Sequence, residues 1–226
     1  MKYAKIIEGR FQDRPNRFIA HVWVDGNLET VHVKNTGRCR ELLVPGCTVY
    51  LAVSDNPKRK TKYDLVAVLK GTKLINMDSQ APNKVVQEWL EAGGLPSLTK
   101  IQPEFKYDQS RFDFYLEQGQ KKAFMEVKGV TLEEDGIVRF PDAPTERGAK
   151  HLQELIKAHK EGYNTYVFLV IQMADVDHFE PNWKTDPAFA QGLLDAAAAG
   201  VKILAYNCAV TPDTLEIKKA VDIRLK

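Results

Sequence analysis

The chain has 226 residues and a hydrophobic content of 44%, which suits one large domain or two small domains with real cores. No apolar run approaches membrane-spanning length, and the N-terminus carries no secretory signal, so we expect no membrane partner. The cysteines, Cys39, Cys47 and Cys208, are odd in number and lack zinc-like spacing. Free thiols in a reducing compartment are therefore expected, which predicts a cytoplasmic protein.

The net charge of +2 hides an asymmetry between the two parts of the chain. Residues 1–80 carry 14 Lys and Arg against 8 Asp and Glu, an excess of +6. Residues 81–226 carry 18 against 22, which leaves −4. The basic first part favours a polyanionic partner, and the acidic second part favours a cation site.

The first 80 residues have the pattern of short strands separated by turns. Asp25-Gly26-Asn27 is a hairpin signal, and residues 39–43 could form a short helix before Pro45-Gly46. Strands are expected near residues 5–7, 18–24, 30–33, 48–53 and 64–69. Five strands with a helix between the third and the fourth match an OB-type barrel. Another small barrel or a sandwich is the alternative.

Basic residues gather in the turns of this first part, where they could bind backbone phosphates. They are Arg10, Arg14 and Arg17 in one turn, Arg38 and Arg40 in a second, and Lys58, Arg59, Lys60 and Lys62 in a third. Aromatic rings that could stack on bases are Phe11, Phe18, Trp23 and Tyr63. We therefore expect this part to bind nucleic acid, with ordinary solvated loops as the alternative.

A boundary falls near residues 79–82, which gives expected domains at residues 1–80 and 81–226. Helices are predicted from Pro82 to about Gly93 and over residues 145–160 and 186–199. Strands are predicted over residues 101–107, 111–117, 122–130, 166–171 and 201–206. This order describes an α/β domain with a mixed sheet and helices on both faces. The tail over residues 215–225 could pack on either domain.

The stretch from Phe112 to Lys128 predicts a hairpin that carries acidic residues on both strands. A turn centred on Gly119 and Gln120 places residues whose numbers add to 239 opposite each other, and Asp113 and Glu126 satisfy that sum. Opposed residues have Cβ atoms about 5 Å apart, and two carboxylates that close repel unless a cation lies between them. Lys128 points to the same face as Glu126. This combination suits a divalent cation that activates water next to a phosphate.

The reverse face of this hairpin is expected to be apolar, with Phe112, Phe114, Met125 and Val127 pointing into a core. A shift of one residue in the turn would change the partner of Asp113 and weaken the prediction. A solvated, charge-paired strand face is the alternative for an acid-x-Lys tripeptide.

Two further glutamates could contribute to the site. Glu88 lies on the helix before the first strand of the second domain and could supply an acidic group directly or through water. Glu104, on the first strand, could face the same side as Asp113. For both residues, simple solvation at the surface is the alternative.

The segment from residue 140 to residue 151 could bring positive groups to the site. Arg147 and His151 are four residues apart and share a helix face, with Lys150 adjacent. If this helix begins beside the acidic strands, its first turn and Arg147 would face a phosphate. Asp142 could cap the helix or touch the metal network, and the cap is the more common role.

Several segments closely resemble the sugar fermentation stimulation protein family (SfsA), over essentially the whole chain. The resemblance implies an N-terminal OB-fold β-barrel followed by a PD-(D/E)XK restriction-endonuclease-like α/β domain. It also implies non-specific DNA binding and a link to the regulation of sugar-utilisation genes, including those for maltose. The nuclease-like motif would map to Asp113, Glu126 and Lys128. The segments are NTGRCREL, VPG, SDNPKRKTKYDL, SRFDF, MEVKGVTL and FPDAPTERGAKHLQEL.

Together these patterns predict a DNA-binding protein with a nuclease-like site. Mg²⁺ or Mn²⁺ would bind Asp113 and Glu126, with the Val127 carbonyl and Glu88 as further ligands, and Lys128 would orient the attacking water. RNA remains an alternative target. Two other functions stay open: a DNA-binding regulator without cleavage activity, and a regulator that senses a ligand or a partner protein.

Overall fold

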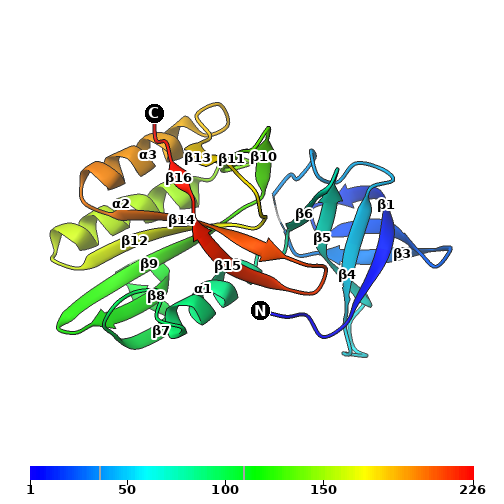
Figure 1. Cartoon of the computed structure of the whole chain (residues 1–226), viewed down its shortest axis with the longest axis horizontal. Coiled ribbons are helices and arrows are strands. Elements are labelled where there is room, and N and C mark those ends of the chain that lie inside the picture. Colours follow the sequence, from blue (N-terminus) through cyan, green and yellow to red (C-terminus); the bar gives the residue numbers. More distant parts are fainter. Residues whose placement is uncertain (36, 109) are drawn as a thin grey trace.

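The computed structural model describes residues 1–35, 37–108 and 110–226. Two domains lie side by side, a β-barrel and a larger α/β domain in which helices cover a sheet (Figure 1). No helix in these ranges is long and apolar enough to cross a membrane.

The smaller domain is a closed barrel. Its strands are β1 (Ile6–Asn16), β2 (Ile19–Val24), β3 (Asn27–Val33), β4 (Thr48–Val53), β5 (Tyr63–Lys70) and β6 (Lys73–Asn76). They follow the order β3-β2-β1-β4-β5-β6, and a parallel pairing of β3 with β5 closes the barrel. Asp25 and Gly26, with φ of 47° and 80°, make the predicted tight turn between β2 and β3. The predicted OB barrel is confirmed.

The short helix expected at residues 39–43 is wrong. The chain there forms turns, with the amide of Leu43 donating to the carbonyl of Cys39 over 3.0 Å. Cys39 has a φ of 46°, in the left-handed region, so a right-handed helix cannot begin at this residue.

The larger domain is built on a mixed sheet. Its strands, in spatial order, are β15 (Leu215–Ala220), β14 (Lys202–Val210), β12 (Asn164–Ile171), β9 (Lys121–Val130), β8 (Ser110–Gln118) and β7 (Leu98–Tyr107). A smaller sheet contains β10 (Leu132–Glu134), β11 (Ile137–Phe140), β13 (His178–Pro181) and β16 (Asp222–Ile223). β12 is parallel to both of its neighbours and is buried along almost its whole length, as its apolar sequence predicts. The C-terminal tail therefore packs on this domain, through β15 and β16.

Helices cover both faces of the large sheet. α1 (Ala81–Glu91) packs on one face, and α2 (Glu146–Lys160) and α3 (Pro187–Ala198) pack on the other. The hydroxyl of Thr145 caps α2 by accepting from the amide of Gly148 over 3.0 Å, and Asp186 caps α3 by accepting from Phe189 over 2.9 Å. The three helices predicted from the sequence are confirmed.

The predicted register of the β8–β9 hairpin is confirmed. The ladder runs from Phe114 opposite Met125 to Gln118 opposite Lys121, and every pair adds to 239. Glu126 and Asp113 lie just beyond the last pair of this ladder.

The expected position of Phe112 is wrong. Its ring packs against Phe124, with centroids 5.1 Å apart, in the core under α2, whereas Phe114 lies in the core under α1. The β7–β8 pairs on either side keep their register, but Glu104, between them, has a φ of 55°. The paired strands therefore bend at Glu104 and Asp113, which swings Phe112 to the other face.

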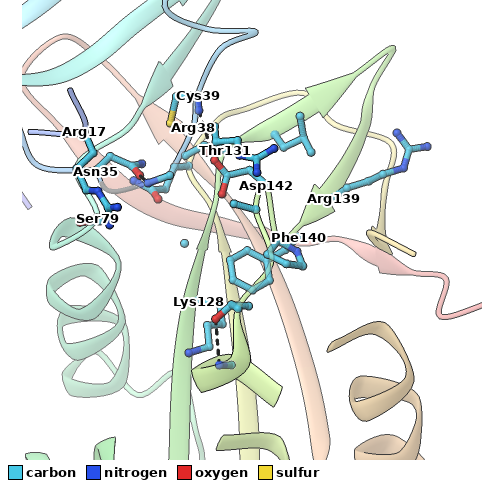
Figure 2. Close-up of a pocket in the computed structure, with 18 of the residues that line it drawn as sticks. Arg17, Asn35, Arg38, Cys39, Ser79, Lys128, Thr131, Arg139, Phe140 and Asp142 are labelled. Atoms are coloured by element: carbon cyan, nitrogen blue, oxygen red, sulfur yellow. Dashed lines mark hydrogen bonds between the residues drawn. The ribbon is translucent and has the colours of Figure 1, made fainter. Parts of the chain in front are cut away.

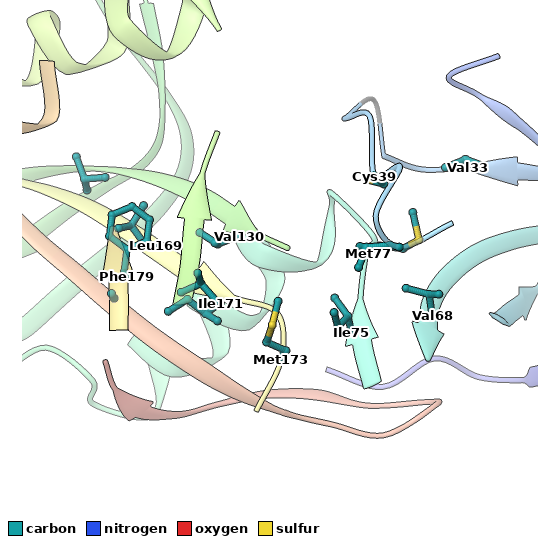
Figure 3. Close-up of a cluster of buried hydrophobic side chains, with 14 of the residues drawn as sticks. Val33, Cys39, Val68, Ile75, Met77, Val130, Leu169, Ile171, Met173 and Phe179 are labelled. Atoms are coloured by element: carbon teal, nitrogen blue, oxygen red, sulfur yellow. The ribbon is translucent and has the colours of Figure 1, made fainter. Parts of the chain in front are cut away.

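The two domains share one continuous hydrophobic core. Ile75 and Met77, at the end of the barrel, lie against Val130, Ile171 and Met173 of the α/β domain (Figure 3). All five side chains are buried, and each is 0% exposed. Apolar contact on this scale resists rotation of one domain against the other.

A buried polar network crosses the same interface. The Gln172 amide donates to Asn76 Oδ1 over 2.8 Å and to the Asp78 carbonyl over 3.1 Å. Beside it, Glu133 pairs with Lys70 at 2.7 Å and with Lys73 at 3.3 Å. The two domains are thus fixed by directional contacts as well as by apolar burial.

Candidate metal and nucleic-acid site

A cleft of about 960 Å³ lies between the barrel and the α/β domain. Figure 2 shows Arg17 and Arg38 on the barrel side and Lys128 and Phe140 on the α/β side. The cleft therefore brings together two groups of residues that the sequence keeps in separate domains.

Asp113 lies at the bend in β8, where its carboxylate replaces a missing strand partner. Oδ2 accepts a hydrogen bond from the amide of Val127 over 2.7 Å, and Oδ1 accepts one from the side chain of Asn83 over 2.8 Å. Asn83 stands in the first turn of α1 and was missed from the sequence, because nothing in the helical pattern separates it from a solvated residue. These contacts fix Asp113 at the edge of the cleft.

Glu126 uses its two carboxylate oxygens differently. Oε1 accepts from the ammonium of Lys128 over 2.6 Å and from the ring of His151. Oε2 is buried and has no hydrogen-bond partner among the described residues. A buried carboxylate oxygen without a partner is costly, so a positive group bound beside Oε2 would be stabilising.

His151 connects Glu126 to Arg147. The side chain of His151 is 5% exposed, and Arg147 donates from Nε to Nε2 of His151 over 3.4 Å. Because Nε2 accepts this bond, Nδ1 carries the proton and donates to Glu126. The chain of donors therefore runs in one direction, from Arg147 through His151 to Glu126.

The pKa values of the two acids are shifted in opposite directions. Burial, followed by the nearby charge of Glu126, raises the pKa of Asp113 above its ordinary value. Burial also acts to raise the pKa of Glu126, but the hydrogen bond from His151 and the charge of Lys128 outweigh it, so the net pKa is lowered. The negative charge of Glu126 is stabilised by its neighbours, whereas that of Asp113 is not. A cation bound beside Asp113 would therefore stabilise the pair.

The donor set fits a hard divalent cation. Asp113 and Glu126 offer carboxylate oxygens, one of them without a partner, and Val127 also lines the cleft. No cluster of three or more His, Cys, Asp and Glu side chains with ligand geometry occurs in the described ranges. An ion that keeps several of its waters, as Mg²⁺ does, matches a site with two acidic side chains.

Arginines surround this acidic pair. Arg17, Arg38 and Arg40 line the cleft from the barrel, and Arg147 lines it from α2. All four are exposed, and none forms an ion pair with a carboxylate within the described part of the chain. Unpaired guanidinium groups are suited to bind phosphate oxygens in pairs.

The structure does not bring Glu88 and Glu104 to the cleft. The carboxylate of Glu88 lies 2.6 Å from the amino group of Met1. Glu104 points to solvent, 3.5 Å from Arg111, because the bend of β7 turns it away from Asp113. Neither of these two possible contributors lines the cleft.

The basic loop between β4 and β5 is also outside the cleft. Arg59 is engaged within the barrel, with both ends of its guanidinium on Asp64, at 2.9 Å for Nη1. Lys58, Lys60 and Lys62 are exposed. Lys150, on α2, likewise lies outside, 3.8 Å from Glu154.

The other predicted barrel contacts divide in a similar way. Phe11 and Tyr63 are 3% and 5% exposed and belong to the core, so they cannot stack on bases. Phe18 and Trp23 are 51% and 43% exposed. Arg14 supports the loop that carries Arg38, since its guanidinium donates to backbone carbonyls there, among them that of Arg38 over 3.0 Å.

Asp142 lines the cleft but does not cap a helix, because Thr145 occupies the capping position of α2. Its carboxylate accepts instead from the amide of Cys39 in the barrel, over 3.4 Å. The same carboxylate lies so close to Gly37 that a Cβ there would overlap with it. Asp142 therefore joins the two domains across the top of the cleft.

Comparison with known proteins identifies the family. Residues 80–214 match the model of the "Sugar fermentation stimulation protein RE domain", and residues 13–77 match the "SfsA N-terminal OB domain". The chain is 59% identical over 225 residues to a sugar fermentation stimulation protein homolog of Desulfitobacterium hafniense, covering 100% of this chain and 99% of that protein. It is 58% identical over 226 residues to one of Clostridium beijerinckii, with full coverage of both chains.

A solved structure agrees with this assignment. Pyrococcus furiosus SfsA, described in complex with Ca²⁺, superposes with a TM-score of 0.90 at 27% identity, over 99% of this chain and 98% of that one. The chain therefore belongs to the sugar fermentation stimulation protein family.

Proposed function

We propose that this protein binds nucleic acid and hydrolyses phosphodiester bonds with a divalent metal ion held by Asp113 and Glu126. One observation carries the proposal: Oε2 of Glu126, buried and without a partner in the described part of the chain, lies beside a second acid in a cleft also lined by Arg17, Arg38, Arg40 and Arg147. An acid on one strand and Glu126-Val127-Lys128 on the next is the arrangement expected of a PD-(D/E)XK-type nuclease. The Ca²⁺ in the Pyrococcus furiosus relative supports a cation site in the fold.

Each residue of the cleft has a role that follows from its position. Asp113 and Glu126, with the Val127 carbonyl, would hold Mg²⁺ or Mn²⁺. When bound, such an ion lowers the pKa of a coordinated water molecule and stabilises negative charge on the phosphate. Lys128, whose ammonium lies 2.6 Å from Glu126, orients the attacking water and stabilises the developing negative charge. Arg147, in the first turn of α2, binds the phosphate that is cleaved.

The barrel supplies binding that does not depend on sequence. Its cleft arginines recognise backbone phosphates, which carry no sequence information directly. DNA is the target that we favour, and RNA presents the same phosphates. A role in regulating sugar-utilisation genes accords with the family name. A cytoplasmic location is part of the proposal, since the three cysteines are unpaired in the described ranges.

The experiment compares the parent with Asp113→Asn and Glu126→Gln on labelled single- and double-stranded DNA and RNA, with Mg²⁺, Mn²⁺ or chelator. We expect metal-dependent cleavage by the parent and a loss of more than about 100-fold in both variants, because each removes a ligand charge. Retention of nucleic acid in a gel-shift assay should change little. Equal cleavage by parent and variants would refute the site. Binding without any cleavage by the parent would favour a non-hydrolytic regulator.

A further inference from the structure

We infer that the cleft receives a single nucleic-acid strand, and that paired duplex cannot reach the acidic residues. The inference rests on the proposed function, since it names the substrate class of the same site. Three features of the cleft support it: the depth of the site, the fixed position of the domains and the distribution of charge.

Glu126 is buried and Asp113 is half-buried. The side chains of Glu126 and Lys128 are 4% and 17% exposed, and residues of both domains rise around them. A duplex is stiff, with a persistence length of about 150 base pairs, so one of its phosphates can enter a recess only if the whole double helix follows. A single strand is narrow and flexible, and its phosphates can enter such a recess one at a time.

The cleft is not built to widen. The shared core beside Ile75 and Met173 and the buried bond between Gln172 and Asn76 hold the domains together on one side. On another side, the carboxylate of Asp142 meets the amide of Cys39. Opening the domains to admit a duplex would break all of these contacts at once.

The distribution of charge favours the cleft, rather than the rest of the barrel, as the surface that binds the strand. Arg17, Arg38 and Arg40 face the site with no carboxylate partner among the described residues. In the β4–β5 loop, by contrast, Arg59 is neutralised by Asp64. A strand that crosses from the barrel to α2 would meet arginines before and after the acidic pair.

An aromatic ring stands at the edge of this path. Phe18 directly follows two cleft-lining residues, Asn16 and Arg17, and is 51% exposed. The guanidinium of Arg17 lies 5.9 Å from the centre of its ring. An exposed ring beside a phosphate-binding arginine is the combination with which proteins stack the bases of single strands.

The test measures binding in chelator, so that it does not depend on hydrolysis. A labelled oligothymidine strand and a blunt duplex of equal length are titrated by fluorescence anisotropy at several salt concentrations. The cleft variant R17Q/R38Q/R40Q is compared with the loop variant K58Q/K60Q/K62Q, which removes the same number of charges. Because all six substituted side chains are exposed, both variants should melt like the parent.

We expect the cleft variant to lose strand affinity and to flatten the slope of log K against log salt by about 2, from about 0.7 per phosphate contact. The loop variant should change both quantities far less, and Phe18→Ala should weaken strand binding by about 10-fold. The parent should prefer the strand to the duplex. Equal affinity for the two, or a larger effect of the loop variant, would overturn the inference. If the strand binds in this way and is never cut, only the proposed hydrolysis fails.

Discussion

His151 donates from Nδ1 to Oε1 of Glu126, and Oε2 of the same carboxylate has no hydrogen-bond partner within residues 1–35, 37–108 and 110–226. Lys128 donates to the same oxygen, so both contacts act on Oε1. Residues that orient a metal ligand in this way typically affect metal affinity by 10- to 100-fold.

The first prediction separates the two hydrogen bonds of His151. In His151→Asn the side-chain amide takes the place of Nδ1 and still donates to Glu126, so Mn²⁺ affinity should stay within a few-fold of the parent. His151→Leu fills the space without donating, and affinity should fall by about 10- to 100-fold. Titration of Mn²⁺ followed by electron paramagnetic resonance measures both values. Equal affinity in all three proteins would show that His151 has no positioning role.

The second prediction concerns acid stability. The ammonium of Lys70, the amide of Gly136 and the ammonium of Lys73 outweigh the burial of Glu133 and lower its pKa from 4.5 to about 2. The unfolded state therefore takes up a proton as pH falls below about 4.5, while the folded state resists until about pH 2. Stability from this group is full above that window and is lost as pH falls through it.

Urea unfolding at a series of pH values checks this expectation. The difference in unfolding free energy between the parent and Glu133→Gln should be constant above about pH 5 and shrink towards pH 2. A difference that does not change with pH would mean that the pairs with Lys70 and Lys73 do not survive in solution.

The third prediction tests the contact over the cleft. In Gly37→Ala the new methyl group overlaps with the carboxylate of Asp142, so the barrel loop must move. We expect a loss of about 1–3 kcal/mol in unfolding free energy. Adding Asp142→Ala removes the overlapping oxygen and should restore part of the loss, which a double-mutant cycle measures. Purely additive effects would argue that the two residues are not in contact.

The fourth prediction is that both domains unfold together. Trp23 reports on the barrel, and Trp89, 5.0 Å from Phe168 between ring centroids, reports on the α/β domain. The chain also contains Trp183, so variants that keep only Trp23 or only Trp89 of the three tryptophans should give coincident transitions. Ile75→Ala, in the shared core, should lower the stability seen by both probes by about 2–5 kcal/mol. Two separate transitions would contradict a single cooperative unit.

The sequence predicts those parts of the site that depend on local geometry. The turn at Gly119 and the alternation of a strand suffice to bring Asp113 towards Glu126, and helical spacing suffices to align Arg147 with His151. The OB barrel and the helices follow from the same two periodicities.

The remaining features depend on irregular backbone and on tertiary contact. The bend at Glu104 changes the face of Phe112, and an ideal strand contains no such bend. The assignment of Arg38 to the cleft and of Arg59 to Asp64 depends on how the barrel sits on its neighbour. The count of basic residues alone favours the loop from Lys58 to Lys62, which lies outside the cleft, over the turn with Arg38 and Arg40, which lines it.

The bond between the Val127 amide and Asp113 has a consequence for reading related sequences. Where the strands part, this amide would be orphaned without an acceptor at position 113, so an acid there has an architectural reason to persist. A relative without the proposed hydrolytic activity would therefore still need an acceptor at this position. Glu126 has an oxygen without a hydrogen-bond partner among the described residues, so its presence or absence in a relative bears more directly on the proposed activity.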